Sequence, residues 1–248
     1  MKNRSERVEF SPAICAELSP NRMLRTRCSA ERNNMIKYIF WDLDGTIMES
    51  GNGVLGSVRY ALEKMGVELP ESEVRKFIGP SLFDSFTNTA HMSDEDAEKA
   101  IKYYRELYEA KGIFDAEVYD GIPETLDRLK KAGYRQFVVT SKPQHMAKRV
   151  LDHFEIMPYL EGMVGPTEDD HSSDKAKLIR AAMDSHNIEK TEAVMIGDRC
   201  FDINGANDVG ILSIGVLYGY GSREELEKSG AGLIVEKAAD IPEAVKRL

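Results

Sequence analysis

Short apolar runs alternate with amphipathic stretches over most of this chain, and each pattern predicts a type of element. A continuous apolar run of about four to eight residues is typical of a strand buried on both faces of a parallel sheet. The apolar runs lie at 38–41, 135–140, 162–164, 193–196, 211–216 and 233–235. The amphipathic stretches predict helices at 122–132 and 174–186, and a third that follows the run at 135–140 and ends near residue 153. The alternation predicts an α/β fold with a doubly wound, parallel, Rossmann-like sheet.

Residues 49–120 interrupt this alternation with a long stretch whose pattern is helical. Ser93 begins the clearest helix, because it suits an N-cap and is followed by three acidic residues in the first turn. The expected helices span 54–65, 71–77, 81–88 and 93–110. We therefore expect a small α-helical domain at 49–120, inserted into a sheet domain formed by 35–48 and 121–248.

The first 34 residues have a different character from the rest of the chain. They carry arginines interspersed with acids, show no sustained helical or strand period, and contain no apolar segment like that of a secretory signal. We expect a disordered N-terminal extension without a catalytic role. The alternative is an upstream start codon, with Met35 as the functional start.

Two aspartates, Asp42 and Asp44, follow the first apolar run directly. Ligands of open α/β sheets bind at the carboxyl ends of the strands, where these side chains would emerge. Two carboxylates this close resist joint ionisation unless a cation or a shared proton compensates them. The pattern indicates a Mg²⁺-assisted phosphoryl-transfer site in which one aspartate is the nucleophile and the other is the general acid/base.

Hydroxyl groups end the run at 135–140, where Thr140 and Ser141 precede a proline. A hydroxyl and neighbouring backbone N–H groups can hold a phosphate there, and the N-terminus of the following helix adds a favourable partial charge. Pro143 fits the first position of that helix. Taken alone, Thr140 and Ser141 fit a simple helix cap better.

A lysine and two further aspartates complete the candidate residues. Lys175 stands in the first turn of a predicted helix, where a positive charge is unfavourable because of the helix dipole. Its position therefore suggests a functional role. Asp198 follows the run at 193–196 and is the kind of hard oxygen ligand that Mg²⁺ prefers. Asp202 lies about one helical turn further on. A surface lysine and a helix N-terminal acid are the structural alternatives for Lys175 and Asp202.

These segments resemble, in the same order, the four motifs of the haloacid dehalogenase (HAD) superfamily. The matching segments are Asp42-x-Asp44-x-Thr46, the strand that ends in Thr140, the helix that begins near Lys175, and Gly197-Asp198-x-x-x-Asp202. The resemblance covers about 35–248. It implies a Rossmann-like core with an inserted helical C1 cap that closes over the active site.

The resemblance also implies a role for each candidate residue. Asp42 would be the nucleophile and Asp44 the general acid/base. Mg²⁺, the expected cofactor, would be bound by Asp42, by Asp198 and by Asp44 through its backbone carbonyl. Asp202 would orient Lys175 or a metal-bound water. The residues expected to contact the phosphate ester are Thr140, Ser141, Lys175 and Gly79.

Two loops resemble those of the phosphoglycolate phosphatase and 5′-nucleotidase-like branch of the superfamily. In the first, 77–82, Gly79 permits close backbone approach or makes an ordinary turn between helices. In the second, Tyr218 and Tyr220 flank a glycine and touch substrate or pack in the interior. The expected activity is hydrolysis of a small phosphate ester. A pyrophosphatase, a sugar-phosphate mutase and a non-catalytic phosphate-binding regulatory protein stay open as alternatives.

Composition narrows the classes of partner. The chain has 248 residues, a net charge of −9 and a pI near 5.2, which disfavours nucleic acid and anionic membranes as main partners. Its three cysteines show no paired pattern, and no apolar run approaches the length of a membrane span. We expect a cytoplasmic enzyme that acts as a monomer or homodimer on a small-molecule phosphate ester.

Overall fold

The computed structural model describes residues 36–167 and 174–248. The predicted N-terminal extension at 1–34 lies outside the described residues, as does most of the loop before Lys175.

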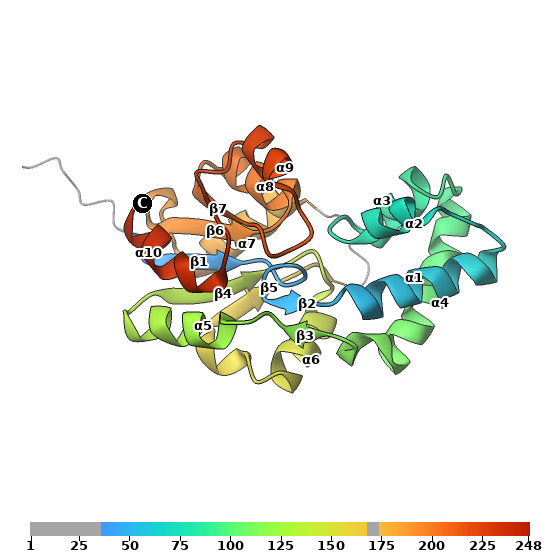
Figure 1. Cartoon of the computed structure of the whole chain (residues 1–248), viewed down its shortest axis with the longest axis horizontal. Coiled ribbons are helices and arrows are strands. Elements are labelled where there is room, and N and C mark those ends of the chain that lie inside the picture. The colour runs from blue at the N-terminus through green and yellow to red at the C-terminus, as the bar shows by residue number, and fades with distance from the viewer. Residues whose placement is uncertain (1–35, 168–173) are drawn as a thin grey trace, which may run out of the picture. The chain divides into compact units, whose positions relative to one another are not determined.

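A six-stranded parallel sheet forms the centre of the described part (Figure 1). Its strands, in spatial order, are β5 (Gly162–Val164), β4 (Arg135–Val139), β1 (Tyr38–Trp41), β6 (Ala193–Gly197), β7 (Leu212–Val216) and β8 (Leu233–Val235). The chain adds β4 and β5 on one side of β1, and then β6, β7 and β8 on the other side. A crevice opens at such a reversal of strand order, outside the carboxyl ends of the strands. The predicted doubly wound α/β fold is confirmed, with strand boundaries within one residue of expectation.

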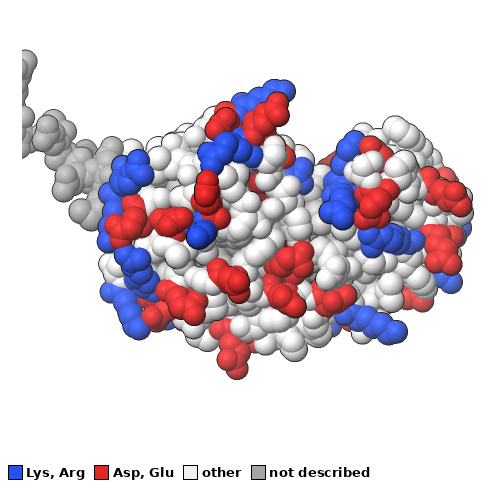
Figure 2. Space-filling model, in the orientation of Figure 1, with Lys and Arg blue, Asp and Glu red and all other residues white. Residues whose placement is uncertain are grey.

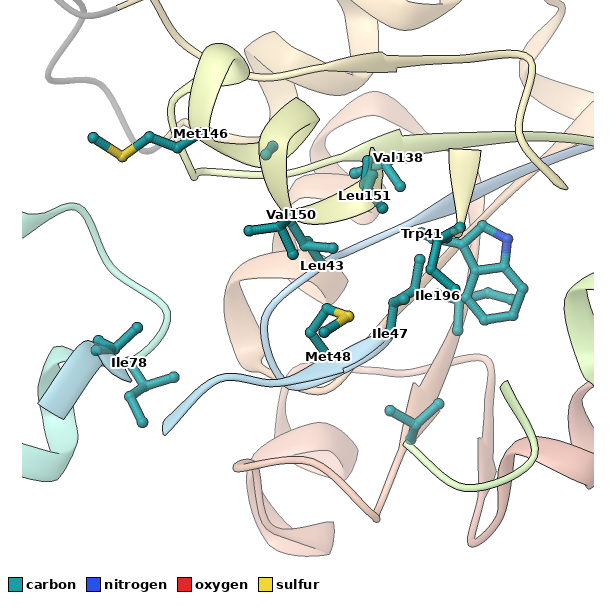
Figure 3. Close-up of a cluster of buried hydrophobic side chains, with 14 of the residues drawn as sticks. Trp41, Leu43, Ile47, Met48, Ile78, Val138, Met146, Val150, Leu151 and Ile196 are labelled. Atoms are coloured by element: carbon teal, nitrogen blue, oxygen red, sulfur yellow. The ribbon is translucent and has the colours of Figure 1, made fainter. Parts of the chain in front are cut away.

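Helices cover both faces of the sheet, because successive residues of its central strand point to opposite sides. Ile39 and Trp41 join a buried cluster with α5 (Ile122–Lys131), α6 (Gln144–His153) and α10 (Ile241–Lys246). Phe40 joins a second cluster with α7 (Lys175–His186) and α8 (Cys200–Val209). Figure 1 shows α5 and α6 on one side of the sheet and α8 on the other. Part of the first cluster appears in Figure 3, where Trp41 and Ile196 lie on neighbouring strands.

The helical insert, residues 49–120, contains four α-helices. They are α1 (Gly51–Met65), α2 (Glu71–Val74), α3 (Leu82–Asn88) and α4 (Asp94–Ala110). Ser81 and Ser93 cap α3 and α4, each accepting a hydrogen bond from a backbone N–H three residues on. The expected helix at 71–77 is divided, since α2 tightens into a 3₁₀ turn at Arg75–Phe77. The division of the chain into a sheet domain and a helical domain remains a prediction.

A pair of short antiparallel strands stands where the chain enters and leaves the helical insert. Strand β2 (Met48–Glu49) pairs with β3 (Glu117–Val118), and the partners are Met48 with Val118 and Glu49 with Glu117. Two residues per strand are too few for a period-2 pattern, so the sequence did not reveal this pair. It holds both connections of the insert side by side.

The remaining elements are short. Helix α9 (Arg223–Lys228) follows the loop that contains Tyr218 and Tyr220, and further 3₁₀ turns lie at Gly112–Phe114, Met157–Tyr159, Lys190–Glu192 and Ala238–Asp240. Within the described residues, no helix has both the length and the apolar character needed to cross a membrane.

Two glycines of α1 provide a matched test of packing within the insert. A Cβ on Gly53 would lie 1.9 Å from the carbonyl oxygen of Gly112, whereas a Cβ on Gly56 would meet nothing within 4 Å. We expect Gly53→Ala to destabilise the protein by about 1–3 kcal/mol through overpacking. Gly56→Ala should stabilise it by about 0.5–1 kcal/mol through helix propensity. Urea unfolding measures the free energy of unfolding of both variants. Equal changes in the two would contradict the close contact between Gly53 and Gly112.

Candidate active site

Three strand ends bring the principal candidates together. Asp42 follows β1, Thr140 follows β4 and Asp198 follows β6, and β1 pairs with both of the other strands. Parallel neighbours end at the same edge of the sheet, so these side chains are placed by strand pairing and not by local loop structure. All three residues are buried.

Lys175 connects this group to α7 and α8. Its Nζ lies 2.8 Å from Asp42 Oδ1 and 2.8 Å from Asp202 Oδ1, and it donates to the carbonyl oxygen of Val139 at 3.1 Å. The residue is only 4% exposed. Burial alone would lower the pKa of Lys175, but the carboxylates of Asp202 and Asp42 raise it above its ordinary value. The structure therefore places Lys175 in the cluster, whereas Lys177 is exposed.

Asp198 is the most deeply buried of the candidate carboxylates, at 0% exposure. Its oxygens accept hydrogen bonds from the hydroxyl of Thr46 at 3.2 Å and from the backbone N–H of Tyr220 at 2.8 Å. Burial, followed by the charges of Asp202 and Asp42, raises the pKa of Asp198 to about 8. The charge of an ionised Asp198 therefore calls for a compensating cation.

Asp42, Asp198 and Asp202 each offer an oxygen atom, and these atoms lie within 4.8 Å of one another. A set of hard carboxylate oxygens suits Mg²⁺ better than softer metals. Asp202 already pairs with Lys175 through Oδ1 and accepts from the Arg199 N–H through Oδ2 at 3.2 Å. Asp42 and Asp198 are thus the carboxylates better suited to direct coordination of a divalent cation.

Burial and the neighbouring Lys175 act in opposite directions on the pKa of the Asp42 carboxylate. Burial raises the pKa of Asp42 to about 6, while Lys175 acts in the opposite direction. A cation bound beside it would favour the ionised form, which is the form able to attack phosphorus.

Asp44 has different partners from Asp42, and the sequence analysis identified neither of them. Lys142 Nζ donates to Asp44 Oδ2 at 2.5 Å, and the hydroxyl of Ser50 donates to Asp44 Oδ1 at 2.6 Å. The Lys142 side chain is 6% exposed and lies over the ring of Tyr108, 5.3 Å from its centroid. The one signal in the sequence was the position of Lys142, directly after the hydroxyls that end β4.

Thr140 and Ser141 both line the cavity that opens above Asp42 and Asp44. The Thr140 hydroxyl accepts from the Lys142 N–H at 3.1 Å. The N-cap of α6 is Pro143, so Pro143 is not the first helical residue as predicted, and neither hydroxyl caps that helix.

The opposite wall of the cavity comes from the helical insert. Gly79 lies on this wall with a φ of +114°, a backbone conformation that favours glycine. Tyr104 and Tyr108 stack there with ring centroids 5.1 Å apart. The apolar residues of this wall are Val54, Phe77, Ile78, Pro80, Leu82, Phe83 and Ile101. The cavity therefore has a charged floor and a largely apolar roof.

Other residues considered from the sequence lie elsewhere. Arg75 and Lys76 line a separate groove on the other side of Ile78. The hydroxyl of Tyr218 donates to the carbonyl oxygen of Thr46 at 3.0 Å, and that of Tyr220 donates to Glu49 Oε1 at 2.9 Å. These tyrosines hold the loop of Asp44 and the start of the insert. On the face drawn in Figure 2, basic side chains are interspersed with acidic ones.

Comparisons with known proteins identify a family and several similar proteins. A family model described as haloacid dehalogenase-like hydrolase matches residues 39–216. A 5′-nucleotidase of Pseudomonas aeruginosa is 36% identical over 198 residues, 79% of this chain and 90% of that protein. Tyrosine-protein kinase PtkA of Mycobacterium tuberculosis is 35% identical over 206 residues, 83% of this chain and 70% of that protein. A predicted phosphatase of Clostridium acetobutylicum has a similar crystal structure, with a TM-score of 0.83, 41% identity, and coverage of 86% of this chain and 100% of that one.

The raised pKa of Asp198 predicts a pH dependence of stability in metal-free protein. The pKa of an aspartate in the unfolded chain is about 4, whereas burial raises the pKa of Asp198 in the folded chain to about 8. Between these values the folded state holds one more proton, so stability falls as the pH rises. Through this group, the free energy of unfolding of the wild type should fall by about 1 kcal/mol per pH unit between about pH 6 and 8. We expect Asp198→Asn to lack this decrease.

Urea unfolding in EDTA at these two pH values measures the effect. Asp208→Asn, at an exposed position of α8, is the control and should follow the wild type. An unchanged slope in Asp198→Asn would show that the carboxylate is ionised at no cost in the folded state.

Proposed function

We propose that this chain, which belongs to the haloacid dehalogenase-like hydrolase family, is a Mg²⁺-dependent phosphomonoesterase. The observation that carries the proposal is the buried cluster of Asp42, Lys175 and Asp198 under a cavity with an apolar roof. Phosphoryl transfer requires a nucleophile, cations around the phosphoryl oxygens and a proton donor for the leaving group. The cluster together with Asp44 supplies residues for each task.

Two aspartates would perform the covalent chemistry. An oxygen of Asp42 forms a bond to phosphorus while the bond to the ester oxygen breaks, giving an aspartyl-phosphate. Asp44 donates a proton to the departing alkoxide and then accepts a proton from the water that attacks the aspartyl-phosphate. The products are the alcohol and inorganic phosphate, and both aspartates return to their starting state.

The surrounding residues would hold the phosphoryl group. Lys175 supplies a positive charge beside Asp42, and Asp202 keeps its ammonium group in place. Thr140 and Ser141 offer hydroxyl groups from the end of the neighbouring strand β4, and Gly79 allows the roof to approach closely.

Mg²⁺ fits the donor set, because Asp198 is a buried carboxylate whose hydrogen-bond donors, a hydroxyl and a backbone N–H, carry no charge. A bound cation would compensate its negative charge. The residues that would hold it are Asp42, Asp198 and the backbone carbonyl of Asp44. When bound, the metal neutralises charge on the phosphoryl oxygens. The helical insert would act as a cap that excludes water during transfer.

The roof favours a leaving group with an apolar, ring-shaped part. Tyr104 and Tyr108 present stacked rings, and Phe77 and Leu82 add further apolar surface. A nucleoside 5′-monophosphate matches this surface better than phosphoglycolate, whose leaving group is a small anion. Phosphoglycolate is the second candidate, favoured by the presence of Lys142 and Arg105 in the lining. The cytoplasmic location and the oligomeric state remain predictions.

Phosphate release across a panel of esters tests the proposal. The panel contains nucleoside monophosphates, phosphoglycolate, sugar phosphates, pyrophosphate and an aryl phosphate, each with Mg²⁺ and with EDTA. We expect Mg²⁺-dependent release, fastest from a nucleoside monophosphate. Asp42→Asn should lower kcat at least about a thousandfold, because it removes the nucleophile.

Each alternative has a distinct outcome in the same assay. A mutase would redistribute phosphate between sugar positions with little release. Tyrosine phosphorylation from ATP would indicate an activity like that in the name of the mycobacterial relative. Binding without turnover in folded wild-type protein would favour the regulatory protein and refute the phosphatase.

Lys142 should matter for turnover although it lies outside the four motifs. Removing its charge leaves Asp44, a half-buried carboxylate, without its cationic partner. We expect Lys142→Met to lower kcat by about ten- to a hundredfold and to shift the pH dependence of kcat, which reports the acid/base group. Lys148→Met, on the exposed side of α6, is the control. Equal kinetics in the two variants would exclude a role for Lys142.

A further inference from the structure

Arg199 follows Asp198 directly and extends away from the carboxylate cluster toward the helical insert. Its guanidinium Nη1 donates a hydrogen bond to the backbone carbonyl oxygen of Ile78. Ile78 belongs to the loop at 77–82, whose other side lines the cavity above Asp42. Figure 3 shows Ile78 on the ribbon of the insert, and its side chain belongs to the same buried cluster as Trp41 and Ile196 of the sheet. Arg199 is therefore a direct polar link between a sheet loop and the roof of the cavity.

The guanidinium is held in this direction by groups on the sheet side. Its Nε donates to Glu225 Oε1 at 2.8 Å, and its plane lies over the ring of Phe201, 5.5 Å from the centroid. Glu225 Oε1 also accepts from the Cys200 N–H at 2.8 Å. The Arg199 side chain is 18% exposed, so this is not a freely solvated surface charge. Burial would raise the pKa of Glu225, but the Cys200 N–H and Arg199 lower it, which keeps the carboxylate ionised.

The backbone of the loop fits closely against Arg199. A Cβ on Gly79 would lie 3.0 Å from Arg199 Nη1 and 3.3 Å from the Phe201 ring. The left-handed φ of +114° at Gly79 also disfavours any side chain at this position. The glycine thus has a structural purpose, which is to let the loop carbonyl reach the guanidinium.

From these contacts we infer that Arg199 is a positioning residue that latches the loop at 77–82 against the sheet domain and so holds the roof closed over the active site. A charge-assisted hydrogen bond in a half-buried setting is stronger than an exposed one. The planar fork of arginine can serve Glu225 and the Ile78 carbonyl at once, which a lysine cannot do in the same geometry. Arg199 does not line the cavity, so its effect on substrate passes through the loop.

Amide hydrogen exchange tests the latch without using enzymatic activity. In Arg199→Met, peptides covering 77–86 should exchange about tenfold faster than in the wild type, since the closed loop has lost a charge-assisted bond. Peptides covering β6 should be unchanged. Arg223→Met, which removes a half-exposed arginine of α9, is the matched control and should leave 77–86 unaffected.

Two further variants guard against a folding defect in Arg199→Met. Glu225→Gln keeps the side-chain shape but removes the charge that holds the guanidinium, and it should speed exchange at 77–86 by a smaller factor. Gly79→Ala should speed it as well, by pushing the loop off Arg199. Unchanged exchange at 77–86 in a folded Arg199→Met protein, or equal acceleration in Arg223→Met, would overturn the latch.

The kinetic consequence rests on the proposed phosphatase function. Arg199→Met should raise KM about tenfold and change kcat by less than about twofold, because roof closure is needed to retain the ester and not for the bond-breaking step. Arg199→Lys should recover only part of the loss. If no ester is hydrolysed by the wild type, the exchange experiment still decides the latch.

Discussion

Lys175 joins two buried carboxylates to a backbone carbonyl, and the arrangement of the surrounding elements depends on this contact. An ammonium group has three protons to donate, and here its partners are Asp42 after β1, Asp202 in α8 and the Val139 carbonyl in β4. A buried charge is costly unless it is paired and hydrogen-bonded, so each element must present its group at the right distance. The pairing fixes α7 and α8 relative to the two central strands.

Glycines make room for these charges. A Cβ on Gly197 would lie 2.2 Å from the Asp202 carboxyl carbon, and one on Gly205 would lie 2.8 Å from the Lys175 Cβ. A Cβ on Gly45 would lie 2.4 Å from Asp198 Oδ2, and one on Gly219 would lie 2.4 Å from the Asp198 Cβ. The glycines beside the aspartates are therefore required by close packing around the carboxylates. The loop that contains Tyr218 and Tyr220 also borders the site, because the Tyr220 N–H donates to the Asp198 carboxylate.

The sequence predicts those features that depend on short-range pattern. The apolar runs identify the strands of the sheet, and the strand ends place Asp42, Thr140 and Asp198 along one edge. Features that depend on pairing between distant segments are not visible in this way. Strands β2 and β3 are too short to show a period, and the bond between Arg199 and Ile78 joins residues 121 positions apart. Lys142 carried a local signal, but its partner Tyr108 lies in the insert, where no motif marks it.

The two catalytic candidates at the end of β1 are held by different parts of the molecule. Asp42 is bound to Lys175 and lies among groups of the sheet domain. Asp44 is bound to Ser50, which precedes α1, and to Lys142, whose ammonium group contacts the ring of Tyr108 in α4. A movement of the insert would thus alter the surroundings of Asp44 while leaving those of Asp42 intact. In the proposed reaction the nucleophile is therefore held from the sheet side alone, whereas the proton-transfer group is held partly by Ser50 and α4 and not by the loop at 77–82.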